Sequence, residues 1–146
     1  MSDLSITAAN VLPSVGAINN RKSAIAAVAI TAGQVLYKLT ATDSTYGITQ
    51  VGLADSNAVS PANSVEGMAI NNAGAGQIVD YVPFDSNFGS GATGVAVGAT
   101  AYLSNTAGGI TVTYADIASA STVITLGVFV SATNFNFNPT IGGIKP

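Results

Sequence analysis

The chain has 146 residues, of which only 8% are charged, with four Lys and Arg, seven Asp and Glu, no His and no Cys. Four basic side chains are too few for the phosphate neutralisation on which nucleic-acid binding depends, so the composition argues against a DNA or RNA partner. Without Cys there is no disulfide framework and no thiolate metal site, and the longest apolar run, residues 24–30, is far shorter than the ~20 residues that span a bilayer.

The low charge also bears on how the surface is used. A chain of this length fits one domain, and soluble domains usually carry about 25% charged residues. A surface this poor in charge favours coverage by a partner, in an oligomer or a larger assembly. The alternative is a monomer kept in solution by its many Ser, Thr and Asn side chains. Residues 1–5, MSDLS, lack the basic and apolar segments of a secretory signal, which predicts synthesis in a cytoplasm.

Residues 1–23 are predicted to form an extended N-terminal arm. Pro13 and Gly16 interrupt any regular pattern, and a polar run, NNRK, follows at residues 19–22. Chain ends of this kind are ordered only when they dock on something. Two interpretations stay open at this point, an arm that reaches onto a neighbouring molecule and an end that is not fixed.

From residue 24 the pattern becomes that of β-strands. In residues 30–40, ITAGQVLYKLT, a turn at Gly33 is followed by period-2 alternation around Tyr37, which is typical of a half-buried strand. Turns rich in Gly, Asn and Asp separate further predicted strands at residues 24–30, 48–53, 65–70 and 77–84. Residues 54–64 are predicted to form a loop.

The second half of the chain resembles the first. Gly98 and Tyr102 have the same spacing as Gly33 and Tyr37, and further matches follow in the same order: Gly109–Thr111 with Gly47–Thr49, Ala115–Asp116 with Ala54–Asp55, Leu126–Val130 with Glu66–Ile70, and Phe135–Phe137 with Ile78–Val82. This order predicts two repeat-like halves, residues 24–84 and 95–138, separated by a loop at 85–94. The alternative is chance similarity in a chain rich in Gly, Ala and Thr.

Short strands at this spacing predict an all-β fold, either a small barrel or a two-sheet sandwich built from two similar β units, with minimal helix. A single β domain would span residues 24–138, and residues 139–146 would form an extended tail. Residues 122–130, TVITLGVFV, are uncharged and strongly β-prone. Exposure of such a segment would cause aggregation, so we expect it in the middle of a sheet or against another subunit.

No group of residues has the pattern of an active site. Without His there is no imidazole base and no imidazole metal ligand. Four of the acidic residues lie in turn-like contexts, where an Asp side chain bonds to its own backbone: Asp43, Asp55, Asp85 and Asp116. We therefore expect a protein that is not an enzyme and has no cofactor or metal, although a carboxylate pair assembled by folding stays open.

Five motifs follow one another and cover roughly residues 32–136: ITAGQVLYKLTATD, VGLADSN, VEGMAINNAGAGQIVDYV, GATGVAVGATAYLSNTAGGIT and VITLGVFVSATNFNFN. In this order they resemble the small capsid cement, or head decoration, proteins of tailed bacteriophages. The resemblance implies a β-rich protein that binds the outside of an expanded icosahedral shell, with the major capsid protein as its partner. It also implies a homotrimer, located on the exterior of the virion, that clamps neighbouring capsomers against the pressure of packaged DNA.

Contacts to the shell or to a neighbouring subunit are expected from the arm segment 4–15 and from the aromatic residues that flank the central loop. The candidates are Leu4, Ile6, Val11, Leu12, Phe84 and Phe88. A rival interpretation from another class is a carbohydrate-binding or host-adhesion module, with Tyr46 or Phe88 in contact with the sugar.

Overall fold

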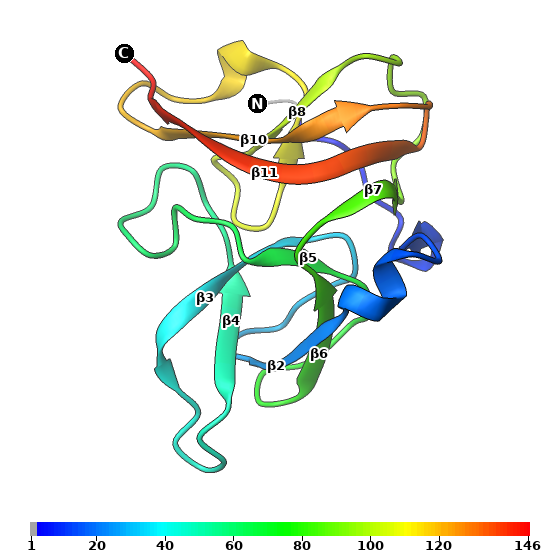
Figure 1. Ribbon diagram of the computed structural model, residues 1–146. Helices are drawn as coiled ribbons and strands as arrows, with labels where there is room; N and C mark the ends of the chain where they lie inside the picture. Colours follow the sequence, from blue (N-terminus) through cyan, green and yellow to red (C-terminus); the bar gives the residue numbers. More distant parts are fainter. Residues whose placement is uncertain (1–2) are drawn as a thin grey trace.

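The computed structural model of the protein describes residues 3–146, so residues 1–2 of the predicted arm lie outside the described range. The fold is all-β, as predicted, and consists of two sheets (Figure 1). The strands are β1 (Val11–Leu12), β2 (Lys22–Ala26), β3 (Val35–Thr42), β4 (Thr49–Leu53), β5 (Gly67–Ala69), β6 (Ile78–Val82), β7 (Asp85–Ser90), β8 (Thr100–Leu103), β9 (Ile110–Thr111), β10 (Thr122–Phe129) and β11 (Asn134–Ile144). Helix is confined, in this range, to the short 3₁₀ turns η1 (Ala8–Asn10), η2 (Ala17–Asn20) and η3 (Tyr114–Asp116).

The first unit, β2 to β6, is a closed five-stranded barrel with the strand order β2-β4-β3-β5-β6, in the lower half of Figure 1. Its strand pairs are antiparallel except β2 and β4, which run parallel and close the barrel, with Ala26 opposite Val51. Small side chains suit a barrel of so few strands because its interior is narrow. The residues that fill it are Ala24, Ala26, Ile30, Leu36, Val51, Ala69, Ala73, Val79 and Tyr81.

The second unit, β7 to β11, is an open sheet that repeats the strand order of the barrel. Read from β4, the closed barrel has the strand order β4-β3-β5-β6-β2. Read from β9, the open sheet has the order β9-β8-β10-β11-β7, and neighbours in both series pair antiparallel. The prediction of two similar β units is therefore confirmed at the level of topology. The units differ in that no pairing joins β7 to β9, whereas the equivalent strands β2 and β4 pair.

The N-terminal arm docks on both edges of this open sheet. Asp3 forms a bridge to Thr111 of β9, and the N–H of Leu4 donates to the carbonyl of Ile110 at 2.8 Å. Further along, β1 pairs with β7 at the opposite edge. Within its own chain the arm is thus docked and not free, because it supplies strand partners that the sheet would otherwise lack. Contact of the arm with a neighbouring molecule stays a prediction.

Four turns of one kind precede β3, β6, β8 and β9. In each turn the fourth residue donates its N–H to the carbonyl of the first, the third is a glycine with positive φ, and the strand begins two residues later. These glycines are Gly33 (90°), Gly76 (84°), Gly98 (87°) and Gly108 (76°). Each glycine N–H also donates to the carbonyl of another segment at 2.7–2.8 Å, on Ala69, Ala26, Phe129 and Ala54 respectively. The match of Gly33 with Gly98 in the sequence belongs to this recurring turn.

One hydrophobic core is shared by the two units. It combines barrel residues such as Val35, Met68 and Val82 with four phenylalanines of the open sheet, Phe88, Phe129, Phe135 and Phe137. The centroids of neighbouring phenylalanine rings are 5.2–6.2 Å apart. Packing of this kind excludes solvent from all four rings, and Phe88 is therefore not the exposed contact that we predicted.

Two segments that were predicted to be irregular are strands. Residues 85–90 of the predicted loop form β7, because Phe88 enters the core and β11 and β1 pair on its two sides. The predicted tail is also wrong, since β11 continues to Ile144, which lies opposite Thr122 of β10. The uncharged strand β10 itself is central, between β11 and β8, as predicted.

Substitution of two of the turn glycines tests how the arm depends on this recurring turn. Gly98→Ala should lower the free energy of unfolding by about 1–2 kcal/mol, because its Cβ would meet nothing within 4 Å and only the positive φ is unfavourable. Gly33→Ala should cost more, because its Cβ would also lie 2.7 Å from Ile6 and 2.9 Å from Val11 of the arm. Denaturant unfolding of both variants measures the difference, and equal losses would contradict the packing of the arm on this turn.

Candidate binding surface

The structure separates the six predicted contact residues into three groups. Leu4, Ile6 and Val11 are partly buried against the shared core of their own chain. Phe88 is fully buried. Leu12 and Phe84 are exposed, and these two side chains are therefore the ones available to a partner.

The buried carboxylate of Asp85, the residue after Phe84, fixes the backbone of the arm at Ser14, two residues after Leu12. Asp85, which is only 2% exposed, accepts hydrogen bonds from the N–H and the hydroxyl of Ser14 at 2.7 and 2.5 Å and from the N–H of Asn87 at 3.0 Å. Hydrogen bonds to a charged group are stronger than those between neutral groups. Asp85 thus holds the arm in place from 71 positions away in the sequence.

Two surface depressions meet at Ser14. One, of about 480 Å³, is lined by Leu12, Pro13 and Val15 of the arm together with Asn87 and Asn134 of the sheet. The other, of about 160 Å³, is lined by Phe84 together with residues 16, 17, 20, 85 and 86. The exposed side chains of Leu12, Val15 and Phe84 around these depressions are called the arm surface below.

Val15 is the member of the arm surface that was not named from the sequence. It lies at the end of the segment 4–15 that was expected to make contacts, and its side chain is 86% exposed. Pro13 and Gly16 on either side of it are the local signal, because a valine between two residues that interrupt regular structure is poorly placed to enter a core.

The outer face of the open sheet carries no charge. Residues directly opposite each other on neighbouring strands share a face, and two such rows cross this sheet: Thr100, Val128 and Asn136, and Tyr102, Thr125 and Thr140. The sequence contains no Asp, Glu, Lys or Arg at residues 86–115 or 117–144. We call these two rows the neutral face.

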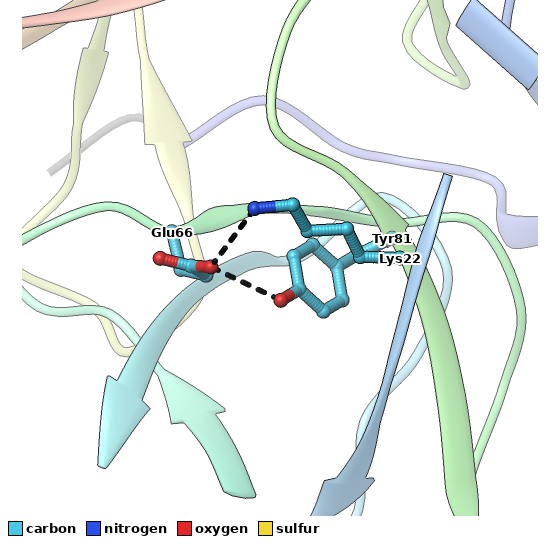
Figure 2. A network of polar contacts seen from close by, with 3 residues as sticks. All are labelled: Lys22, Glu66 and Tyr81. Carbon is cyan, nitrogen blue, oxygen red and sulfur yellow. Dashed lines mark hydrogen bonds and ion pairs between the residues drawn. The ribbon is translucent and has the colours of Figure 1, made fainter. Parts of the chain in front are cut away.

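The barrel carries a polar network of Lys22, Glu66 and Tyr81 (Figure 2). One oxygen of Glu66 accepts a hydrogen bond from the hydroxyl of Tyr81 at 3.1 Å and lies 3.9 Å from Nζ of Lys22. Burial raises the pKa of the Tyr81 hydroxyl well above its usual value, and the charge of Glu66 and the hydrogen bond to it raise this pKa further. Tyr81 therefore acts as a hydrogen-bond donor that links the buried core of the barrel to Glu66.

The acidic side chains have structural partners rather than one another. Asp43 accepts hydrogen bonds from the N–H groups of Thr45 and Tyr46, and Asp55 accepts one from Asn57, as expected for turn-forming aspartates. Among residues 3–146 no three potential ligands from His, Cys, Asp and Glu come together. No helix of that range is long and apolar enough to cross a membrane.

A third depression, an apolar groove, lies on the barrel beside the tip of the β3–β4 hairpin. It has a volume of about 590 Å³ and is lined by Ile25, Tyr46, Ile48, Gly76, Gln77 and Ile78. Tyr46 is 73% exposed, which makes its ring accessible to a ligand.

Comparison with known proteins adds no relative: no protein-family model, no curated protein and no solved structure matches the chain.

The raised pKa of Tyr81 predicts a loss of stability in alkaline solution. A group whose pKa is higher in the folded than in the unfolded state stabilises the fold fully below the unfolded value, here 10, and loses that contribution as the pH rises above it. The free energy of unfolding should therefore fall between about pH 10 and pH 12, and it should fall less steeply in Tyr81→Phe, which lacks the hydroxyl. Denaturant unfolding over this pH range checks the prediction, and parallel curves for the two proteins would contradict it.

Proposed function

We propose that this protein is a non-enzymatic structural component of a tailed-phage virion, which binds the outer surface of the icosahedral capsid and stabilises the expanded shell. Its proposed partner is the major capsid protein, and the homotrimer is the oligomer that the sequence resemblance implies. The observation that carries the proposal is the arm surface, where apolar side chains point outward from a firmly docked segment.

The way in which the arm is held favours binding. The arm surface lies on backbone that is fixed by Asp85 and by the pairing of β1 with β7. A surface that is ordered before it binds loses little conformational entropy on association, so more of the contact energy contributes to affinity. Apolar side chains at the centre of a contact and few charges around them are the usual composition of a stable protein interface.

Stabilisation of a shell follows from binding alone. A ligand that binds the assembled shell and not its separated subunits stabilises the assembly in proportion to the logarithm of its concentration over its dissociation constant. The protein therefore needs no catalytic group for this role, only a surface that matches the expanded shell.

Quantitative mass spectrometry of particles purified on a density gradient tests the proposal directly. A copy number comparable to that of the major shell protein is expected. A few copies per particle would point to a fibre or adhesion role instead, and absence from the particles would overturn the proposal.

A matched pair of substitutions tests the arm surface. Val15→Asp should weaken binding to undecorated expanded shells by at least about tenfold, because it places a charge in an apolar contact. Val59→Asp is the control, since Val59 is equally exposed, at 84% against 86% for Val15, but lies in the loop after β4. Co-sedimentation with shells measures both, and equal binding of the two variants would exclude the arm surface as the contact.

A carbohydrate-binding or adhesion module is the second candidate, and the groove at Tyr46 is the observation that favours it. An exposed aromatic ring beside the amide of Gln77 offers stacking and a hydrogen bond to a sugar. If this function holds, binding on a glycan array should be lost in Tyr46→Ala and kept in Tyr114→Ala, an exposed tyrosine outside the groove. No signal from the wild-type protein would rule the candidate out.

A further inference from the structure

The arm takes the place of a strand pairing that the second unit lacks. In the barrel β2 and β4 pair and close the sheet, whereas the equivalent strands β7 and β9 do not pair with each other. Both of them bond to the arm instead: β1 pairs with β7, and Asp3 and Leu4 bond to β9. The opening between β7 and β9, which the arm closes, is called the arm-binding site below.

Four glycines of the arm-binding site leave room for the arm. A Cβ atom built on any of them would lie only 2.7–2.9 Å from an atom of the arm, which is closer than real Cβ contacts. The glycines are Gly33, Gly89, Gly91 and Gly109, and the arm atoms belong to Ile6, Leu12, Thr7 and Asp3 respectively. The arm-binding site therefore fits the arm so closely that a single added methyl group would have to displace it.

Two hydrogen bonds between a carboxylate and a serine hold the ends of the arm in this site. At one end Asp3 of the arm accepts from the hydroxyl of Ser104 at 2.6 Å. At the other end Ser14 of the arm donates to Asp85. The side chains between these ends that pack against the shared core are those of Leu4, Ile6 and Val11. The site thus offers polar and apolar partners for the arm in particular, and not for any extended strand.

The connection between the arm and the barrel is short and exposed. It consists of Val15 and Gly16. On either side of it, Ser14 bonds to Asp85 and Ala17 is buried in the shared core. The side chain of Val15 is 86% exposed, and a Cβ on Gly16 would meet no atom within 4 Å. Rotation about these two residues would move the arm out of its own binding site and leave the barrel unchanged.

We propose that the arm-binding site of one copy takes the arm of a second copy in exchange for its own. The exchanged arm makes the same contacts that the structure shows within one chain, so the partner is defined by its sequence, residues 3–15. In dilute solution the chain's own arm is favoured, because a short connection gives it an effective concentration in the millimolar range. Copies that are crowded to a similar concentration therefore link through exchanged arms. The proposal does not depend on the proposed capsid function.

Cutting the connection in the full-length protein removes the advantage of the chain's own arm. A protease recognition sequence inserted between Val15 and Gly16 allows the cut to be made after the protein has folded. The cut arm should stay bound, and an excess of labelled peptide of residues 3–15 should replace it at equilibrium. Fluorescence anisotropy measures the binding of the peptide. A peptide that does not bind to the cut protein would overturn the proposal.

Matched glycine substitutions locate the binding of the peptide. Gly89→Ala should weaken it at least about tenfold, because its Cβ would lie 2.9 Å from the carbonyl oxygen of Leu12. Gly74→Ala is the control, since its Cβ would meet only the end of the Gln77 side chain, at 3.2 Å, and in neither glycine is φ positive. Circular dichroism shows whether each variant folds. Equal binding by the two variants would exclude the arm-binding site as the contact.

Cross-linking tests the exchange between two intact copies. Because the chain has no Cys, Leu12→Cys in one batch and Asn87→Cys in another each provide one reactive site, and both residues line the same depression. A short thiol cross-linker should join the two chains in mixtures near millimolar concentration and not in dilute ones. Val59→Cys, in an exposed loop, replaces Asn87→Cys as the control. A yield that is no higher with Asn87→Cys than with Val59→Cys would contradict the exchange.

Discussion

Gly108, in the turn between β8 and β9, forms hydrogen bonds with two backbone groups of the barrel and thereby links the two units of the protein. Its N–H bonds to the carbonyl of Ala54 at 2.7 Å, its carbonyl accepts the N–H of Val35 at 3.0 Å, and Ala54 and Val35 bond to each other at 2.9 Å. Movement of one unit against the other would therefore break several hydrogen bonds at once. Only glycine suits this position, because φ is 76° and a Cβ would lie 3.0 Å from the side chain of Leu53. The shared phenylalanine core and the docking of the arm both require the units to be fixed in this way.

Much of the fold was predictable because the chain repeats a local signal. A glycine followed two residues later by an alternating strand is visible at Gly33 and Gly98, and it specifies the turn and the face of the strand that follows. Strands β7 and the end of β11 were missed because their sequences, DSNFGS and NPTIGGI, have the composition of loops. Their partners lie elsewhere: Phe88 is opposite Phe135, and Ile144 is opposite Thr122. Tertiary pairing overrides local propensity in such segments.

The candidate surface was predictable only in part, for a related reason. Leu4, Ile6, Val11 and Leu12 are all hydrophobic, so the sequence alone does not distinguish them. In the docked arm the first three pack against the core, whereas Leu12 faces solvent. That docking depends on the bond between Ser14 and Asp85, and no short-range pattern links residues so far apart. The aspartate was expected to bond its own turn, which it does through Asn87. Its second role in anchoring the arm becomes visible only in three dimensions.

The order of the arm and its partners along the chain affects the order of events during synthesis. The arm is translated before its partners in β7 and β9, which emerge only after residues 85–111 have been made. The barrel, by contrast, contains all its strands once residue 82 has emerged, so it can close while the second unit is still incomplete. Contacts between residues far apart in sequence form late because of the chain entropy that they restrict. The apolar residues of the arm thus remain uncovered for most of translation, until both of the strands on which the arm docks have been made.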